Sequence, residues 1–279
     1  MNSNVKCILC SSSKTETIQK NGIDFIYCNN CDFLFIKNYP SANELISKFE
    51  QDYIMAPREY LRAEHRRSFR LFAQLELLSE IYQYKHPPAK ILDYGCGRGY
   101  FIDEARRHGY ITYGVEISRS AIYYCKNIGL NVVNNIEDIN DTFDIVLMYN
   151  SLLKSPDPIL TLKSIRNKMS DDSYLIIKVP YSKTKSWKLF QTSDFQFFNQ
   201  QYLQHFSPKS LKLLLEISGF QTIKIDLKKS KKKYHRRMLY LSTQIFRTFF
   251  NLDMPLIERI KRMLVITFRK EISAIAKKK

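Results

Sequence analysis

Two pairs of cysteines near the N-terminus have the C-x2-C spacing of metal ligands, Cys7 with Cys10 and Cys28 with Cys31. The 17 residues between the pairs suit a tetrahedral zinc site with four thiolates. Within this interval, Asn21-Gly22 precedes the β-prone run IDFIYC, which predicts the hairpin of a zinc ribbon. Because four thiolates leave zinc no open position, we expect a structural Zn²⁺ that replaces the core such a short segment cannot build.

A second group of candidate residues lies in ILDYGCGRGYF, which holds three of the eight glycines: Gly95, Gly97 and Gly99. Without a Cβ atom, the backbone there can adopt positive φ and approach a ligand closely. Asp93 precedes this turn, and Glu116 ends the next β-prone run, where a carboxylate can accept both hydroxyls of a ribose. Dinucleotide turns have the spacing G-x-G-x-x-G and bind a pyrophosphate. Since Asp93 would repel that group, D-x-G-x-G-x-G favours a nucleoside ligand with an amino group and a sulfonium.

Short apolar runs alternate with amphipathic stretches from residue 89 onward. The strand-like runs are KILDYG, ITYGVEI, NVVNN, FDIVLMYN and YLIIKVPY, and the helical ones are YFIDEARRHG, SRSAIYYCKNIG and DPILTLKSIRNKM. This alternation predicts βαβ units with right-handed crossovers and a parallel sheet, with the glycine turn between the first strand and its helix. Upstream, residues 58–84 predict a long helix that ends before Pro87-Pro88.

These motifs together resemble those of class I S-adenosylmethionine (SAM)-dependent methyltransferases. More narrowly, the chain is similar to a bacterial group that joins an N-terminal zinc ribbon to a methyltransferase core and is often encoded with sugar-modification or cell-surface polysaccharide genes. The likeness covers nearly the whole chain, through both cysteine pairs and ILDYGCGRGYF, GVEIS, FDIVLMYNSLLKSPDP, YLIIKVP and QHFSPKSLKLLLEISGF. It implies an α/β fold: a Rossmann-like, seven-stranded, mostly parallel sheet preceded by the small ribbon. QTIKIDL would be the sixth strand and EISAIAKK the antiparallel last strand.

The expected organisation is a zinc ribbon over residues 1–40, a helical linker over 41–88 and a methyltransferase domain over 89–279. Residues 228–279 hold 16 Lys or Arg and 3 acidic residues, so this tail carries +13 of the net charge of +17. A basic amphipathic helical insertion is expected at about 230–268. Such helices bind anionic membrane surfaces, where each basic residue contributes about 1 kcal/mol. The alternative is a helical pair packed on its own domain or on a second subunit.

The resemblance also implies where SAM binds. Asp93 and the three glycines would border the methionine portion of SAM, and Glu116 would bind its ribose. With the structural Zn²⁺, SAM completes the expected cofactor set. Cys96, inside the glycine turn, and Cys125 belong to neither cysteine pair and are interpreted as packing residues.

Two later segments complete the implied site. Asn135 and Ile136 would flank adenine; many relatives have Asp at the first position, but the Asn amide can still accept from the adenine amino group. Tyr149 and Asn150, at the end of the fourth strand, would lie beside the methionine end. Relatives commonly have a Glu-His pair where this chain has Leu153-Lys154, so that pair is lost or another residue replaces it.

Methyl transfer from a sulfonium is an in-line displacement, so the enzyme supplies mainly alignment, and a base if the acceptor is a hydroxyl or an acidic carbon. Candidate bases lie in the aromatic-rich segment after the fifth strand. His205 is the first candidate because its unperturbed pKa lies near neutrality, and Tyr181 and Tyr202 follow it. Alternatively, His205 packs at the start of a helix that Ser207 caps and Pro208 opens.

The expected function is methyl transfer to a small-molecule or glycan acceptor, specifically a saccharide or lipid-linked glycan precursor. The resemblance alone implies this acceptor class. One alternative is an RNA methyltransferase, motivated by the ribbon and the basic run. The fourth strand, however, lacks the Asp/Asn-Pro-Pro-aromatic turn typical of enzymes that methylate nucleobase nitrogens. A third is a catalytically lapsed cofactor-binding or scaffold protein, motivated by Leu153-Lys154.

The sequence also bears on location. The N-terminus has no apolar leader, and no run of about 18 uncharged apolar residues could span a bilayer. We therefore expect a cytoplasmic protein, which would be peripheral at the inner membrane face if its basic tail binds lipid. Nucleic acid is a less favoured partner, and the oligomeric state is left open.

Overall fold

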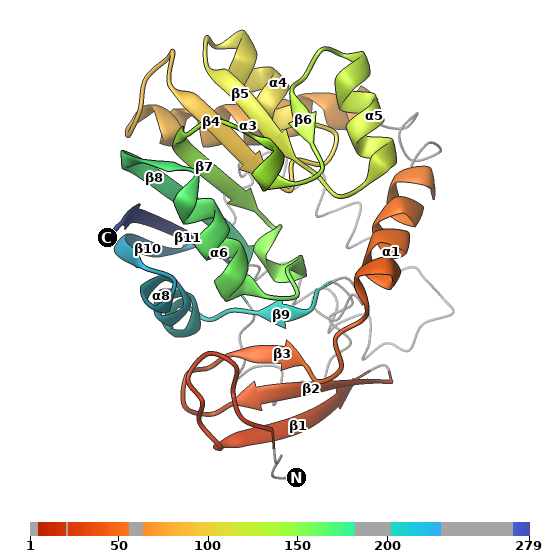
Figure 1. Ribbon diagram of the computed structural model, residues 1–279, viewed down its shortest axis with the longest axis vertical. Coiled ribbons are helices and arrows are strands. Elements are labelled where there is room, and N and C mark those ends of the chain that lie inside the picture. Colours follow the sequence, from red (N-terminus) through yellow and green to blue (C-terminus); the bar gives the residue numbers. More distant parts are fainter. Residues whose placement is uncertain (1–4, 21, 56–63, 182–201, 230–269) are drawn as a thin grey trace. The chain divides into compact units, whose positions relative to one another are not determined.

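The computed structural model shows two kinds of sheet (Figure 1). The chain has two compact units, one that includes the cysteine-rich N-terminal segment and one that includes the glycine turn. The structure describes residues 5–20, 22–55, 64–181, 202–229 and 270–279. The expected basic insertion at about 230–268 lies outside the described residues.

The first unit contains a four-stranded sheet in the order β1-β2-β3-β9. β1 (Thr15–Lys20) and β2 (Ile23–Cys28) form the antiparallel hairpin that the sequence predicts. β3 (Leu34–Ile36) pairs with β2 on one side and with the short β9 (Gln204–His205) on the other. The ribbon sheet therefore includes a strand from far along the chain, which the cysteine spacing did not predict.

Aromatic side chains form the core of this first unit. Phe33 stacks on Phe35 with ring centroids 5.4 Å apart, and the tilted ring of Phe206 has its centroid 5.3 Å from that of Phe33. Phe25, Phe33 and Phe206 are each at most 1% exposed. Segment 202–207 thus supplies apolar packing that a ribbon of this length lacks, in addition to what a metal ion would supply.

The second sheet has seven strands in the order β10-β11-β8-β7-β4-β5-β6. The strands are β4 (Lys90–Tyr94), β5 (Ile111–Val115), β6 (Val132–Val133), β7 (Phe143–Tyr149), β8 (Met169–Pro180), β10 (Phe220–Lys229) and β11 (Lys270–Lys278). β4 pairs in parallel with β5 and with β7, so the strand order reverses direction at β4. Ligands bind at such switch points, beyond the carboxyl ends of the strands. The seven-stranded, mostly parallel sheet with its antiparallel end is confirmed.

Helices connect and cover these strands. They are α1 (Ala42–Met55), α3 (Glu64–Tyr82), α4 (Tyr100–Arg107), α5 (Arg119–Asn127), α6 (Pro158–Asn167) and α8 (Pro208–Ile217), with short 3₁₀ turns η1 (Ile136–Asp138) and η2 (Leu152–Lys154). Their starts follow capping chemistry: Asp157 accepts from the N–H of Leu160 before α6, and Ser207 accepts from the N–H of Ser210 before α8. The predicted Ser207 cap is therefore confirmed.

The core beneath the glycine turn is aliphatic. Ile91 and Ile145, from adjacent strands, are fully buried, as are Ile102 of α4 and Ile81 of α3. Because α3 contributes to this core, the helix predicted upstream of the sheet is packed onto it. The predicted domain boundaries after residues 40 and 88 stay predictions.

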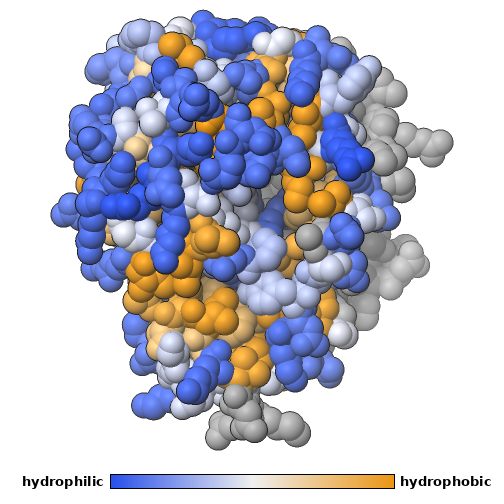
Figure 2. Space-filling view, in the orientation of Figure 1, coloured by the Kyte–Doolittle hydropathy of each residue, from blue (hydrophilic) through white to orange (hydrophobic). Residues whose placement is uncertain are grey.

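The surface mixes hydrophilic and apolar residues, and on the face drawn in Figure 2 apolar residues gather in separate patches among hydrophilic ones. Exposed apolar side chains include Tyr123 (70% exposed) and Leu160 (61%). Among the described residues, no helix is both long and apolar enough to cross a membrane.

Candidate functional site

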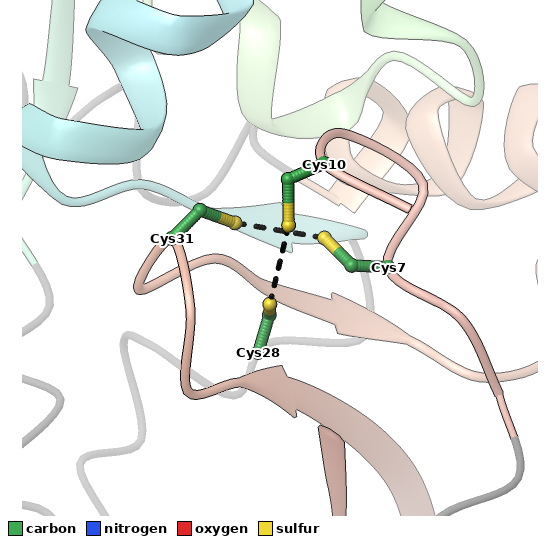
Figure 3. Close-up of side chains that lie close together, drawn as sticks. All are labelled: Cys7, Cys10, Cys28 and Cys31. Carbon is green, nitrogen blue, oxygen red and sulfur yellow. Dashed lines mark hydrogen bonds between the residues drawn. The ribbon is translucent and has the colours of Figure 1, made fainter. Parts of the chain in front are cut away.

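The four cysteines of the ribbon converge (Figure 3). Their Sγ atoms all lie within 4.8 Å of one another, and the Cys7–Cys31 and Cys10–Cys28 separations are both 3.6 Å. In a tetrahedral site with Zn–S bonds of about 2.3 Å, sulfur atoms lie about 3.8 Å apart. The cluster thus has the donor set and size for zinc, with little room for a further ligand.

The two cysteine pairs form matching turns. The N–H of Ser11 donates to the carbonyl of Cys7 at 2.9 Å, and the N–H of Asp32 donates to that of Cys28 at 3.0 Å. Ser11 and Asp32 have φ of 56° and 57°, in the left-handed region. Each turn brings its two thiols together on the side that faces the other cysteine pair. The C-x2-C spacing predicts that the thiols are close but not these backbone conformations.

The thiols of this cluster also have unequal pKa values. A hydrogen bond from Cys31 lowers the pKa of Cys7 to about 5, against the opposing effect of burial. Burial raises the pKa of Cys28, and the hydrogen bond to Cys7 together with burial raises that of Cys31. A bound cation would remove this inequality, because metal ligation deprotonates every thiol.

The glycine turn follows β4, and its three glycines have φ of 85°, 57° and 69°. A Cβ on Gly95 would lie 2.5 Å from Cβ of Ser151, and one on Gly99 would lie 2.5 Å from Cδ1 of Leu130. Both separations are shorter than van der Waals contact. The glycines therefore serve both the conformation and the close packing of the turn.

Glu116 holds the turn from the neighbouring strand. Its Oε2 accepts from the N–H of Gly97 at 2.8 Å, and its Oε1 accepts from Ile117 and Ser118 at 2.8 and 2.9 Å. The side chain is buried, with residue exposure of 7%. The acid thus lies against the glycine turn, as expected for a ribose-binding carboxylate, and the ribose role itself stays a prediction.

Three buried polar atoms at this edge have no hydrogen-bond partner among the described residues: Asp93 Oδ1, Asn150 Oδ1 and Ser151 Oγ. Asp93 is the penultimate residue of β4, and the other two follow β7, the neighbour of β4 in the sheet. Burial and the charge of Glu116 raise the pKa of Asp93 to about 7. Unsatisfied buried polar groups are costly, so these atoms fit a polar ligand such as an amino-acid moiety. Ser151 was not among the predicted residues, although it directly follows one of them.

The predicted adenine side follows β6. Asn135 caps η1 by accepting from the N–H of Glu137 at 3.2 Å, and Ile136 is buried. The side-chain carbonyl oxygen of Asn135 has a second lone pair, which could accept from the adenine amino group. Tyr149, at the end of β7, is 44% exposed. These assignments stay predictions.

Cys96 and Cys125 are brought together by the fold. Both thiols contact the carbonyl oxygen of Gly97, at 3.7 and 3.5 Å. A hydrogen bond between them raises the pKa of Cys96 and lowers that of Cys125. They pack against the glycine turn as a pair, whereas the sequence suggested two unrelated packing residues.

The candidate bases belong to the first unit. His205 is 1% exposed in β9, with ring centroids 6.1 Å from both Phe25 and Tyr202. Burial lowers its pKa to about 4. Tyr181 follows β8 at the edge of the described residues. These surroundings favour the packing interpretation of His205, and both catalytic assignments stay predictions.

Lys154 lies in η2, at one of the two positions where relatives commonly have a Glu-His pair. Its Nζ lies 4.8 Å from the ring centroid of Phe49 in α1, a cation–π contact.

Comparison with known proteins supports the same fold. Similar solved structures include a SAM-dependent methyltransferase from Archaeoglobus fulgidus, with TM-score 0.52 and 22% identity over 79% of this chain and 99% of that one. Magnesium protoporphyrin IX methyltransferase from Synechocystis PCC 6803 has TM-score 0.55 and 11% identity, with 86% and 100% coverage. A Haloferax volcanii methyltransferase complex with the Trm112 activator has TM-score 0.55 and 14% identity, with 82% and 96% coverage.

No curated protein sequence matches the chain. A family of methyltransferase domains, however, matches residues 62–225, more than half of the chain. This interval contains the glycine turn, Glu116 and the unpartnered buried atoms of Asp93, Asn150 and Ser151. The chain belongs to this methyltransferase family and is a class I SAM-dependent methyltransferase.

Proposed function

We propose that the protein methylates a saccharide or a lipid-linked glycan precursor, in polysaccharide biosynthesis. The observation that carries methyl transfer is the set of unpartnered buried atoms on Asp93, Asn150 and Ser151 around the glycine turn. The acceptor class is supported by the similarity to the bacterial group that combines a zinc ribbon with a methyltransferase core.

SAM supplies an electrophilic methyl group on a sulfonium. In the proposed site, Glu116 accepts the ribose hydroxyls with lone pairs that its backbone contacts leave available. Ionised Asp93 accepts from the amino group of the methionine portion, directly or through water, and Asn150 and Ser151 lie beside the same end. Tyr149 and the Asn135-Ile136 segment flank the nucleoside.

The main contribution of the protein is alignment of donor and acceptor. A hydroxyl acceptor must also lose a proton. His205 and Tyr181 remain candidate bases, although a pKa of about 4 makes His205 a weak proton acceptor at neutral pH.

The acceptor is tested by comparing glycans from cells with and without the gene. Loss of one CH₂ mass from a defined glycan in the deletion strain, restored by the wild-type gene but not by Glu116→Ala, is the expected result. Unchanged glycans would contradict the saccharide acceptor. Calorimetry with S-adenosylhomocysteine (SAH) separately tests cofactor binding.

A second candidate acceptor is RNA, favoured by the charge of +13 in residues 228–279. RNA binding through phosphates would weaken steeply as salt concentration rises. The same basic residues suit an anionic membrane, where lipid-linked acceptors are located. Flotation with neutral and anionic liposomes, alongside RNA binding at two salt concentrations, distinguishes these partners.

A further inference from the structure

Every backbone N–H group from Ser118 to Ala121, at the start of α5, donates a hydrogen bond to a side-chain oxygen. Glu116 accepts from the N–H of Ser118, and Ser118 Oγ accepts from that of Ala121. The two N–H groups between them, of Arg119 and Ser120, donate to the carboxylate of Glu50. The start of the helix beside the ribose-binding acid is thus satisfied partly from outside, by a residue of α1.

Glu50 also accepts from both serine hydroxyls of this turn, Ser118 Oγ at 3.2 Å and Ser120 Oγ. Its charge lies at the positive end of the α5 dipole, where an anion is stabilised. Although burial opposes ionisation, these hydrogen bonds together lower the pKa of Glu50 below its usual value. Figure 1 shows α1 next to α5.

Phe49, the residue before Glu50 in α1, contacts the segment that follows β7. Phe49 is buried, and its ring centroid lies 4.8 Å from Nζ of Lys154 in η2, which follows β7. α5 follows β5, and β4 lies between β5 and β7 in the sheet. Two consecutive residues of α1 therefore contact segments on both sides of the strand that carries Asp93 and the glycine turn.

We propose that α1 covers the cofactor site and that Glu50 is the positioning residue that couples this cover to the segment after Glu116. This inference rests on the proposed cofactor site. Cofactor binding orders the turn between Glu116 and α5, the same turn that Glu50 holds, so each stabilises the other. Through its contact with Phe49, Lys154 helps to hold α1 over the site, and it does not take the role that the Glu-His pair has in relatives.

The test compares Glu50→Gln with Glu44→Gln. Glu44 is on the same helix, but its carboxylate accepts from the N–H and hydroxyl of Ser41, at 2.7 and 2.8 Å, rather than from the start of α5. We expect Glu50→Gln to weaken SAH binding about tenfold, or about 1.4 kcal/mol, and to raise the KM for SAM with little change in kcat. Glu44→Gln should leave both constants unchanged. Equal SAH affinity in folded Glu50→Gln and wild type, or equal losses in both variants, would overturn the proposal.

A double-mutant cycle with Ser120→Ala checks the contact itself. If Glu50 acts through the α5 turn, Ser120→Ala should cost less SAH affinity in Glu50→Gln than in wild type. Additive losses would contradict the coupling. Melting temperatures are recorded for each variant, because a purely structural role would lower them without separating KM from kcat.

Hydrogen exchange on the wild-type protein needs no variant. SAH should slow exchange at the amides of Arg119 and Ser120 and along α1. Protection confined to the glycine turn would contradict the cover, whereas wild-type protein that fails to bind SAH would contradict the cofactor site. The two failures are thereby distinguished.

Discussion

The N–H of Gly97 donates to Oε2 of Glu116 at 2.8 Å, which joins the glycine turn after β4 to the acid after β5. The two motifs that indicated a nucleoside ligand are therefore one structural unit. The same carboxylate also accepts from two amides at the start of α5. Glu116 thus shapes both the glycine turn and the start of α5.

Glu116→Gln should accordingly affect both binding and stability. An amide side chain has one accepting oxygen in place of two, so a hydrogen bond to a charged group, worth about 1.5–3 kcal/mol, is lost. We expect SAH affinity to fall at least tenfold by calorimetry and the free energy of unfolding to fall by about 1–2 kcal/mol in urea. Glu137→Gln, an exposed carboxylate 3.9 Å from Lys168, is the control and should change neither. Unchanged SAH affinity in Glu116→Gln would refute the ribose assignment.

Asp93 should give cofactor-free protein a distinct pH dependence. Its pKa of about 7 exceeds the ordinary 3.8, so the folded state keeps a proton that the unfolded state loses. Its contribution to stability therefore declines as pH rises from about 4 to about 7, by on the order of 4 kcal/mol. Asp93→Asn should remove this decline and raise the melting temperature at pH 8. Parallel stability–pH curves for the two proteins would contradict the assignment.

SAH should respond to Asp93 in the opposite direction. A ligand ammonium group favours the ionised carboxylate, so SAH should bind more tightly as pH rises through 7, with release of a proton. Calorimetry in buffers of different ionisation enthalpy measures that proton. Asp93→Asn should bind SAH weakly without this pH dependence, although the variant is more stable at pH 8. Improved binding by the variant would argue against a contact with the amino group.

Gly99→Ala separates crowding from backbone strain. Its Cβ would lie 2.5 Å from Leu130 Cδ1 and 3.1 Å from Cys125 Sγ, at a φ of 69°. Gly129→Ala is matched in φ, at 74°, but its Cβ would meet only Arg106, at 3.6 Å. Both variants incur the left-handed penalty of about 1–2 kcal/mol, and Gly99→Ala should lose a further 1–3 kcal/mol, approximately, to overpacking. Urea unfolding measures the difference, and equal losses would show that the turn relaxes around the methyl group.

The cysteine cluster should hold one zinc ion per chain. Cys28→Ser should lose this zinc, measured by elemental analysis, and should be cleaved faster by protease within the first unit, because metal binding is coupled to folding of the ribbon. Cys96→Ser changes a thiol outside the cluster and should retain the metal. Full zinc occupancy in Cys28→Ser would contradict the four-ligand site.

Sequence patterns predicted those features that depend on local chemistry. The C-x2-C spacing, the alternation of strands and helices and the Ser207 cap all follow from residues near one another in the chain. Features that require tertiary contacts were missed. β9 adds to the ribbon across more than 160 residues, and neither Glu50 nor the Cys96–Cys125 pair has a sequence signal that joins its partners.

His205 shows how such a tertiary contact changes an interpretation. The near-neutral unperturbed pKa of a histidine in the aromatic-rich segment suggested a base, but His205 is buried in β9 against the ribbon, and burial lowers its pKa to about 4. The unfolded chain binds a proton near pH 6.5 that the folded protein excludes, so His205 makes the protein less stable as pH falls from about 6.5 to about 4. This pH trend is opposite to that of Asp93. The contribution of each residue is therefore measured as the difference between the stability–pH curve of the wild type and that of the variant at that residue.

His205→Gln should therefore flatten the acid side of the stability–pH curve while lowering the melting temperature, because Phe25 and Tyr202 lose their ring contact. Once the methyl acceptor is identified, kcat of the folded variant should stay within a few-fold of that of the wild type. A general base would instead contribute about 100-fold or more to kcat. Such a loss at an unchanged melting temperature would return His205 to the catalytic role. An imidazole NMR signal that titrates near pH 6.5 in folded protein would likewise contradict its burial.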